Sequence, residues 1–216
     1  MVKTFFRFTA LTLALVVMPA LPRAAIDVSD LSIAELSAVE MVSSHINDIR
    51  TMRGTFEQTA PDGQVTQGRF FIERPGKLRF DYAPPSHMTL ISDGFWVAVQ
   101  DRQLETTERY PLRTTPLRIL LSDDLDLLED ARILDVNPDV EDGTVSVTLE
   151  STSRRVDGSI TLFFDPVAGQ LDRWTVRDAQ GLDTQVDLGE VERGVEIEAR
   201  YFRIIEDTTL DVGERD

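Results

Sequence analysis

The side chains best suited to catalysis are scarce or badly spaced in this sequence. It contains no cysteine, which excludes disulfides, thiol catalysis, zinc–thiolate sites and lipid attachment to a thiol. Its two histidines, His45 and His87, are far apart, and neither has a second histidine at metal-ligand spacing. We therefore expect no metal site, no cofactor and no catalytic histidine.

Carboxylates are abundant, but their spacing does not form a recognisable site. The run Asp123–Asp126 lacks the central glycine of a calcium loop, and in Asp139–Gly143 Val140 stands where a ligand is required. The sequence also lacks the Gly-x-Ser-x-Gly turn of α/β-hydrolases and a nucleotide phosphate loop. A glycosidase-type carboxylate pair could still be hidden among the 38 Asp and Glu residues, because linear spacing does not reveal one. We expect a protein that is not an enzyme.

The charge and composition limit the classes of partner. The formal net charge of −16 at pH 7 argues against nucleic acid, whose backbone this surface would repel. It disfavours an anionic membrane surface for the same reason. The hydrophobic share of 42% is typical of a globular chain, and no linker or composition shift divides it. We expect a single domain.

The N-terminus has the pattern of a secretory signal peptide. Lys3 and Arg7 precede a short apolar run that Pro19 and Pro22 break, and Ala24-Ala25 follows. The run is too short to span a bilayer comfortably, which disfavours the alternative of a membrane anchor. We predict a signal peptide over residues 1–25, cleaved near Ala24 or Ala25, and one domain over residues 26–216.

The elements after this leader begin with an amphipathic helix. Ser32 and Glu35 fit a capping box, and apolar residues then recur at helical spacing to about Ile49. Met52–Gly54 is expected to end this helix. Short alternating segments follow, separated by Asp-Gly and Pro-Gly turns, as in an antiparallel β meander. The expected strands are Thr55–Thr59, Val65–Glu73, Leu78–Tyr82, Met88–Ser92, Phe95–Gln100, Leu104–Tyr110, Ile133–Val136, Val145–Leu149, Ser159–Phe164, Leu171–Arg177, Thr184–Val191 and Val195–Ile205.

One face of this sheet is apolar and requires a cover. Alternation places Leu78, Phe80 and Tyr82 on one face, and the charged residues between them on the other. The segment Thr115–Leu121, with Pro116 at a helix start, predicts one or two short helices. These helices and the N-terminal helix are the available covers, so we predict a curved sheet with an apolar interior. Either a filled core or an open cavity fits this pattern.

Several segments together resemble a known family. They are Phe56-Glu57-Gln58, the run Gly68–Tyr82 with Arg74-Pro75 inside it, Leu90–Gly94, and Thr115-Pro116 with its apolar turn. In this order, behind a signal peptide and a helix, they resemble LolA, the family of periplasmic carriers that move lipoproteins to the outer membrane of Gram-negative bacteria. The resemblance implies a mainly β (α+β) fold. It would be an unclosed, strongly curved antiparallel half-barrel of about 11 strands with helices as a lid over an apolar cavity.

The resemblance also implies roles for individual residues. Arg74 occupies the position of the family arginine that hydrogen-bonds lid carbonyls and latches the empty cavity. Residues near this motif would line the acyl-chain cavity, and a short apolar segment would form the lid helix. The implied cavity residues are Phe71, Leu78, Phe80, Tyr82 and Leu90, and the implied lid residues are Leu117, Ile119 and Leu120. Two departures from the family pattern are the early Phe95-Trp96 pair and Arg118 within the apolar lid turn.

The function implied by the resemblance is that of a monomeric periplasmic chaperone for lipoproteins. Its implied partners are lipoprotein acyl chains, an inner-membrane ATP-driven release transporter, and an outer-membrane acceptor or the outer membrane itself. Two alternatives stay open. One is a LolA-fold periplasmic lipid-binding sensor or regulator, and the other is a β-rich envelope hydrolase with a hidden carboxylate pair.

Overall fold

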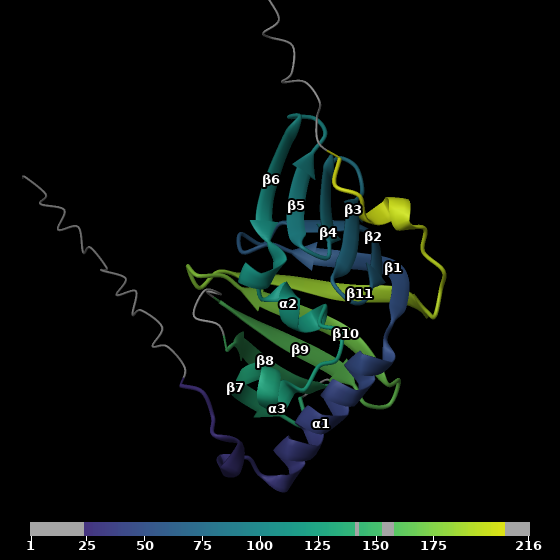
Figure 1. The fold of residues 1–216 in the computed structure, drawn as a ribbon. Helices are drawn as coiled ribbons and strands as arrows, with labels where there is room; N and C mark the ends of the chain where they lie inside the picture. The colour runs from purple at the N-terminus through teal and green to yellow at the C-terminus, as the bar shows by residue number, and fades with distance from the viewer. Residues whose placement is uncertain (1–23, 141–142, 153–157, 206–216) are drawn as a thin grey trace, which may run out of the picture.

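The computed structural model describes residues 24–140, 143–152 and 158–205. Within them an antiparallel sheet of 11 strands runs in the order β6-β5-β4-β3-β2-β1-β11-β10-β9-β8-β7 and does not close into a barrel (Figure 1). The prediction of a mainly β, unclosed half-barrel is therefore confirmed.

The strands are β1 Thr51–Thr59, β2 Val65–Glu73, β3 Lys77–Tyr82, β4 Met88–Asp93, β5 Trp96–Asp101, β6 Thr106–Pro111, β7 Ala131–Asn137, β8 Val145–Ser151, β9 Ser159–Asp165, β10 Gln170–Arg177 and β11 Asp183–Arg193. The helices are η1 Val28–Asp30, α1 Ile33–Asp48, η2 Leu112–Thr114, α2 Leu117–Leu120, α3 Leu127–Asp130 and η3 Ala199–Phe202. Most of the predicted leader lies outside the described residues.

Helix α1 begins at the predicted capping box. The Glu35 N–H donates to Ser32 Oγ at 3.3 Å, and the Ser32 N–H donates to Glu35 Oε2 at 2.8 Å. Met52–Gly54, expected to end the helix, instead belongs to β1, because buried Met52 pairs with Ile72 of β2. None of the helices in the described part of the chain is long and apolar enough to cross a membrane.

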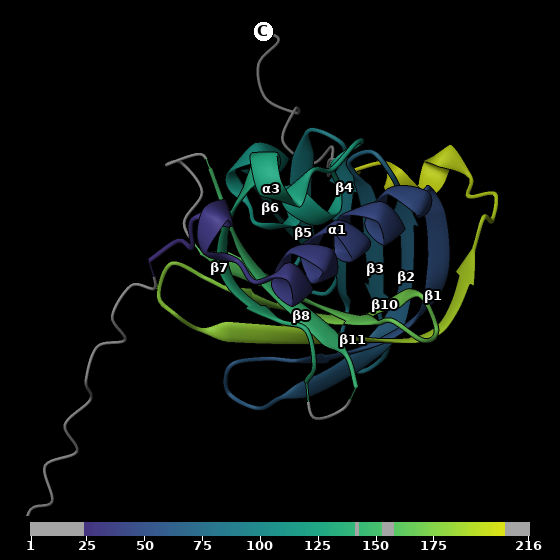
Figure 2. The ribbon, with the colours of Figure 1, turned by 90° about the horizontal axis from the view of Figure 1, so that it is seen from below.

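The core lies on the concave face of the sheet, beneath the helices. Strand register aligns Phe70 with Phe80 and Ile72 with Leu78, so these side chains form continuous apolar rows. Figure 2 shows α1 lying across this face, with α3 beside it. The buried helix and lid residues that pack on the sheet are Ala38, Val39, Val42, Ile46, Ile119, Leu120, Leu121, Leu125 and Leu127. We call α1, α2, α3 and the connection Leu121–Asp126 the lid.

The C-terminal segment differs from the prediction. Val195–Ile205 was expected to be a strand, but it contains η3 and crosses the convex face of β2–β5 as an irregular strap. Strand β11 already lies between β1 and β10, and Gly194, with φ of 65°, turns the chain out of the sheet. The Tyr201 ring packs against the Phe71 ring in a tilted arrangement, with 4.6 Å between the centroids. We call Val195–Ile205 the C-terminal strap.

Candidate functional site

Arg74 joins the sheet to the lid. It follows β2, and its side chain is buried, with 6% of the residue exposed. Its Nε donates to the carbonyl oxygen of Ser122 at 2.8 Å, and its Nη1 donates to the carbonyl oxygens of Ile46 and Ile49. Nη2 donates to Oδ1 of Asn47 at 3.1 Å. One guanidinium therefore holds the end of α1 and the connection after α2 together.

Helix chemistry explains why an arginine suits this position. The last carbonyls of a helix have no partner within the helix, and the helix dipole favours a cation there. Burial lowers the pKa of the Arg74 guanidinium, and neighbouring Arg50 acts in the same direction, whereas Asp123 and Asp124 raise it. A guanidinium nevertheless stays protonated in proteins. The contact is therefore charge-assisted at every pH that the folded protein meets.

Asn47 is a second connection that the sequence analysis did not single out. Its Oδ1 accepts from the Leu125 N–H at 2.9 Å, and its Nδ2 donates to the Leu125 carbonyl oxygen at the same distance. Because the same Oδ1 also accepts from Arg74, one side chain links α1, the lid connection and the sheet. An isolated asparagine near a helix end has no motif, so the sequence alone could not have identified it.

The turn between β2 and β3 is packed closely against its neighbours. The Gly76 N–H donates to the Leu121 carbonyl oxygen at 2.8 Å, and Ser92 Oγ donates to the Gly76 carbonyl oxygen at 2.6 Å. Gly76 has φ of 78°, and a Cβ there would lie 2.7 Å from Cα of Gly94. This backbone conformation and this close approach both require glycine. The turn therefore fixes the position of Arg74 relative to the lid.

A cluster of aromatic rings lies under the lid, with Phe80 at its centre. The centroid of the Phe80 ring is 4.5 Å from that of Phe56, 5.8 Å from Phe70 and 6.0 Å from Trp174. Phe56 also meets Tyr82 edge-on at 5.1 Å. Such rings bury large apolar areas and pack favourably in tilted pairs. The cluster is therefore an apolar, largely aromatic part of the concave face.

Gly68 and Tyr82 shape the margin of this cluster. A Cβ on Gly68 would lie 2.1 Å from the Asp81 carbonyl oxygen and 2.7 Å from the Phe56 ring, so only glycine leaves room. The Tyr82 hydroxyl donates to Gln58 Oε1 at 2.7 Å. Burial raises the pKa of Tyr82 to about 12. The Tyr82 hydroxyl therefore stays neutral at physiological pH and adds no charge to the margin of the concave face.

The structure brings most of the predicted cavity residues together. Leu78 and Phe80 are buried on the concave face, and Tyr82 and Leu90 lie half-buried beside them. Contrary to the expectation, Phe71 points to the convex face, where Tyr201 covers it. Strand register explains this, because Phe70 is the residue that pairs with Phe80 on the concave side. Sequence reasoning also missed Trp174, for which β10 offers no motif.

The predicted lid residues lie on α2 and its cap. Ile119 and Leu120 are buried against the core, and Leu117 is half-buried at the margin. Arg118 donates from Nη1 to Ser151 Oγ of β8 at 2.9 Å. This contact connects α2 to the strand next to the β7 edge, far along the sheet from Arg74. The lid is therefore tied to the sheet at two separated points.

Carboxylates gather at a hollow of about 580 Å³ between α1 and α3. Several of them serve the local backbone: Asp126 Oδ1 accepts from the Leu128 N–H, and Asp130 Oδ2 accepts from the Asp126 N–H. Across residues 24–140, 143–152 and 158–205, no group of His, Asp or Glu side chains is placed to hold a metal ion. The chemistry that the arrangement offers is apolar binding beneath a cover held by hydrogen bonds.

Comparison with known proteins gives a consistent match. A family model described as "Outer membrane lipoprotein carrier protein LolA" matches residues 47–205. The outer-membrane lipoprotein carrier protein of Halorhodospira halophila is 28% identical over 197 residues, which cover 86% of this chain and 90% of that protein. The protein of the same name from Alkalilimnicola ehrlichii is 29% identical over 201 residues, covering 89% and 86% respectively.

Solved structures are more distant in sequence. The LolA superfamily protein from Nitrosomonas europaea is 13% identical and aligns with a TM-score of 0.41, over 80% of this chain and 99% of that chain.

Proposed function

This chain belongs to the LolA family of outer membrane lipoprotein carrier proteins, and from that membership we propose that it carries lipoproteins across the periplasm. It would bind the acyl chains of lipoproteins released from the inner membrane and deliver them to the outer membrane. The observation that carries this proposal is that the apolar face of the sheet is covered by a lid that polar contacts hold in place. Arg74 makes these contacts at the end of β2, and Arg118 makes a second contact with β8.

The energetics favour a cover that opens and closes. Each buried CH₂ of an acyl chain contributes about 0.8 kcal/mol, so a lipoprotein anchor cannot cross water unaided. The Phe80 cluster is sealed in this closed state, and an acyl chain would have to displace the lid to reach it. A hydrogen bond to a charged group contributes about 1.5–3 kcal/mol, which is small enough for a ligand to offset.

The residues have distinct parts in this proposal. Leu78, Phe80, Tyr82 and Leu90 would contact acyl chains, together with Phe56, Phe70 and Trp174, which join the same cluster. Arg74 would favour the closed state, and α2 would be displaced when cargo enters. By analogy with the LolA family, loading energy would come from an ATP-driven transporter in the inner membrane. An outer-membrane acceptor, or the outer membrane itself, would receive the cargo.

Direct measurement of ligand binding tests this proposal. The mature chain is mixed with a fluorescent triacylated lipopeptide, and binding is followed by anisotropy and by native mass spectrometry. We expect one lipopeptide per chain, and weaker binding when Leu90 or Leu117 at the cluster margin is replaced by Glu. These positions are half-buried, so the charge can be introduced without unfolding the core.

A matched control comes from the convex face. Phe163 of β9 lies there, half-buried under the guanidinium of Arg173 at 4.2 Å. Phe163→Glu introduces the same charge and should leave lipopeptide binding unchanged. The proposal fails if wild-type protein does not bind the lipopeptide, or if Leu90→Glu and Phe163→Glu behave alike.

A further inference from the structure

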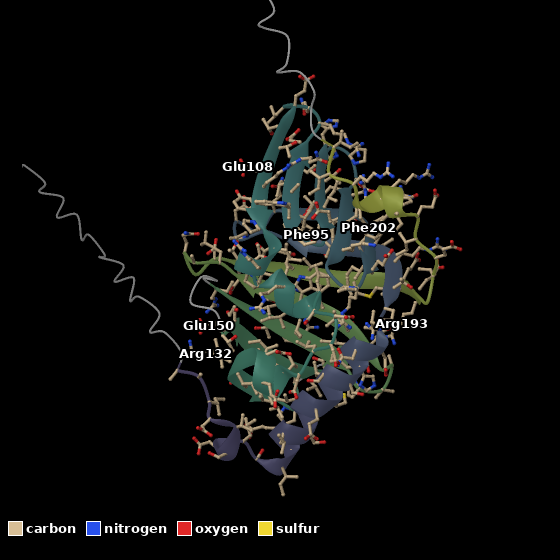
Figure 3. The ribbon with its side chains drawn as sticks, in the orientation of Figure 1. Phe95, Glu108, Arg132, Glu150, Arg193 and Phe202 are labelled. Carbon is tan, nitrogen blue, oxygen red and sulfur yellow. The ribbon has the colours of Figure 1, made fainter. Side chains whose placement is uncertain are left out.

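An exposed aromatic pair lies where the turn after β4 leads into β5, with Trp96 as the first residue of that strand. Phe95 is 80% exposed and Trp96 is 44% exposed. Asp93 Oδ1 accepts the N–H groups of both residues at 2.8 Å, and the Phe95 carbonyl oxygen accepts the Leu112 N–H at 2.9 Å. Figure 3 labels Phe95 at the end of the β4–β5 pair that adjoins α2. These hydrogen bonds fix the backbone of the pair and leave the Phe95 ring in water and the Trp96 ring partly exposed, as is typical of an interaction surface.

One side of this pair is basic, although Asp93 lies in the turn itself. A hollow of about 370 Å³ beside the rings is lined by Pro111, Leu112, Arg113 and Arg118. Residues 109–121 contain three arginines and no acidic residue, although acidic residues outnumber basic ones by 38 to 22 in the chain. Arg113 is exposed, and within the part of the chain that the structure describes it has no ion-pair partner. We call Phe95, Trp96 and Arg113 the aromatic–basic rim.

We propose that the aromatic–basic rim docks on the surface of a bilayer that contains anionic phospholipid. Aromatic side chains such as Trp favour the headgroup level of a membrane, where the ring is partly apolar and partly wet. Guanidinium groups bind phosphate with paired hydrogen bonds, and basic residues are attracted to anionic headgroups. The rim presents both groups on one surface. The apolar lining of the adjoining hollow fits a lipid better than an acidic peptide, which would need additional polar partners.

The net charge of −16 does not prevent this docking. At physiological ionic strength charges more than about 8 Å from the bilayer are largely screened, so the residues nearest the headgroups determine the interaction. The acidic surface elsewhere instead orients the molecule, because repulsion is smallest when the rim faces the lipid. The expectation of repulsion from the net charge therefore holds for the chain as a whole but not for this rim.

The biological meaning of this inference rests on the proposed function. Docking by the rim would bring α2, which carries Arg118 of the same hollow, next to the bilayer. A lipid anchor leaving the concave face would then have a short path to the membrane. The test below uses vesicles without lipoprotein, so its failure is separate from a failure of cargo binding.

Tryptophan fluorescence provides the test. The chain has two tryptophans, and Trp174 is 2% exposed, so a change of emission on adding vesicles reports Trp96. Vesicles of phosphatidylcholine with 30 mol% phosphatidylglycerol are added to the mature chain at physiological ionic strength, where acidic residues far from the bilayer are screened. We expect a blue shift, quenching by brominated lipid, and loss of both signals in Trp96→Phe. Raising the salt concentration should reverse the binding.

Charge-matched variants separate the rim from general electrostatics. Arg113→Gln should lower the partition coefficient about fivefold, because one basic residue near the surface is removed. Arg132→Gln makes the same charge change on β7, at the opposite edge of the sheet (Figure 3), and should have little effect. Phe95→Ser should weaken binding, whereas Leu104→Ser, at a position that is 68% exposed, should not.

Any of the following results would overturn the proposal. The first is an unchanged Trp96 emission with anionic vesicles. The second is equal binding to pure phosphatidylcholine, or equal effects of Arg113→Gln and Arg132→Gln. The third is a response of Trp96 to soluble polyglutamate but not to vesicles, which would assign the rim to an acidic protein segment.

Discussion

Nε of Arg74 donates to the carbonyl oxygen of Ser122 at 2.8 Å, although the two residues lie in different layers of the molecule. The same guanidinium reaches the last turn of α1, so a single side chain on the sheet holds two parts of the lid. The closed state therefore depends on a side chain that bears no apolar ligand surface. Closure can therefore be weakened without altering the apolar surface that the proposed cargo would contact.

Replacement of Arg74 by Ala should loosen the lid without unfolding the sheet. The carbonyl oxygens of Ser122 and Ile46 lose a charged donor, which lowers the free energy of unfolding by about 2–3 kcal/mol. Hydrogen exchange should accelerate at Ile46–Ile49 and in the connection after α2. Because the closed state competes with ligand, lipopeptide should bind roughly tenfold tighter and leave more slowly. Arg74→Lys should behave similarly, since an ammonium cannot span these acceptors. Unchanged hydrogen exchange and unchanged lipopeptide affinity would contradict the role of Arg74 in holding the lid closed.

Locking α2 to β8 should prevent cargo uptake. The chain has no cysteine, so Arg118→Cys with Ser151→Cys creates a single pair for a cleavable bismaleimide. We expect the cross-linked protein to exclude lipopeptide and to regain binding when the linker is cleaved. The control is Arg177→Cys with Asp183→Cys in the β10–β11 hairpin, whose ion pair measures 2.7 Å. Uptake by the locked lid would show that cargo enters by another route.

Gly68→Ala should be strongly destabilising. Its Cβ would lie 2.1 Å from the backbone oxygen of Asp81, which cannot move without displacing β3. We expect a loss of about 2 kcal/mol or more in urea unfolding. Gly189→Ala is the matched control, because its Cβ would lie 2.9 Å from the Thr55 hydroxyl, which can rotate away, and 4.0 Å from the Thr55 carbonyl oxygen, which is an ordinary contact. Equal losses for the two variants would exclude the steric explanation.

The buried Tyr82 hydroxyl should make the folded protein less stable at alkaline pH. Its pKa is raised by burial to about 12 from the ordinary value of 10.0, so the folded state keeps its proton to higher pH than the unfolded state. The stability is therefore complete below about pH 10 and is lost as the pH rises toward 12, by up to about 2–3 kcal/mol. Urea unfolding at several pH values should show this decline in wild type and a smaller decline in Tyr82→Phe. Parallel curves for the two proteins would refute the assignment.

The C-terminal strap should contribute to stability through Phe202. This residue is 4% exposed on the convex face, and Lys77 Nζ lies 5.8 Å from the centroid of its ring. Phe202→Ala should lower the free energy of unfolding by about 3 kcal/mol. Phe95→Ala makes the same truncation at a position that is 80% exposed, and its effect should stay within about 0.5 kcal/mol. Similar effects at both positions would mean that the strap does not pack as described.

The features that local chemistry determines were predictable from the sequence. The capping box at Ser32 needs only its own turn, and the alternation of Leu78, Phe80 and Tyr82 needs only its own strand. The short helices around Thr115–Leu121 follow from a proline at a helix start. These elements were sufficient to predict a one-sided sheet with helical covers.

The features that depend on distant partners were not predictable. Phe70 and Phe71 are adjacent apolar residues, and only the pairing of Phe70 with Phe80 decides which of them faces the lid. Val195–Ile205 alternates like a strand, but no sheet edge was free beside β11. Asn47 acts through acceptors and donors of the lid connection, which lie far away in sequence. Each of these placements requires knowledge of the assembled sheet.

The order of the strands has a consequence for how the chain folds. Among the described strands, every neighbouring pair is consecutive in sequence except β1 with β11, which joins residues near Thr51 to residues near Arg193. The strands from β1 to β6 and from β7 to β11 can each form as a local meander, because closing their short connecting loops costs little conformational entropy. The seam between β1 and β11 must then close over most of the chain length, so it should limit the folding rate. Linking the two ends of the chain, with new termini opened between β6 and β7, should therefore accelerate folding while leaving every strand pair in place.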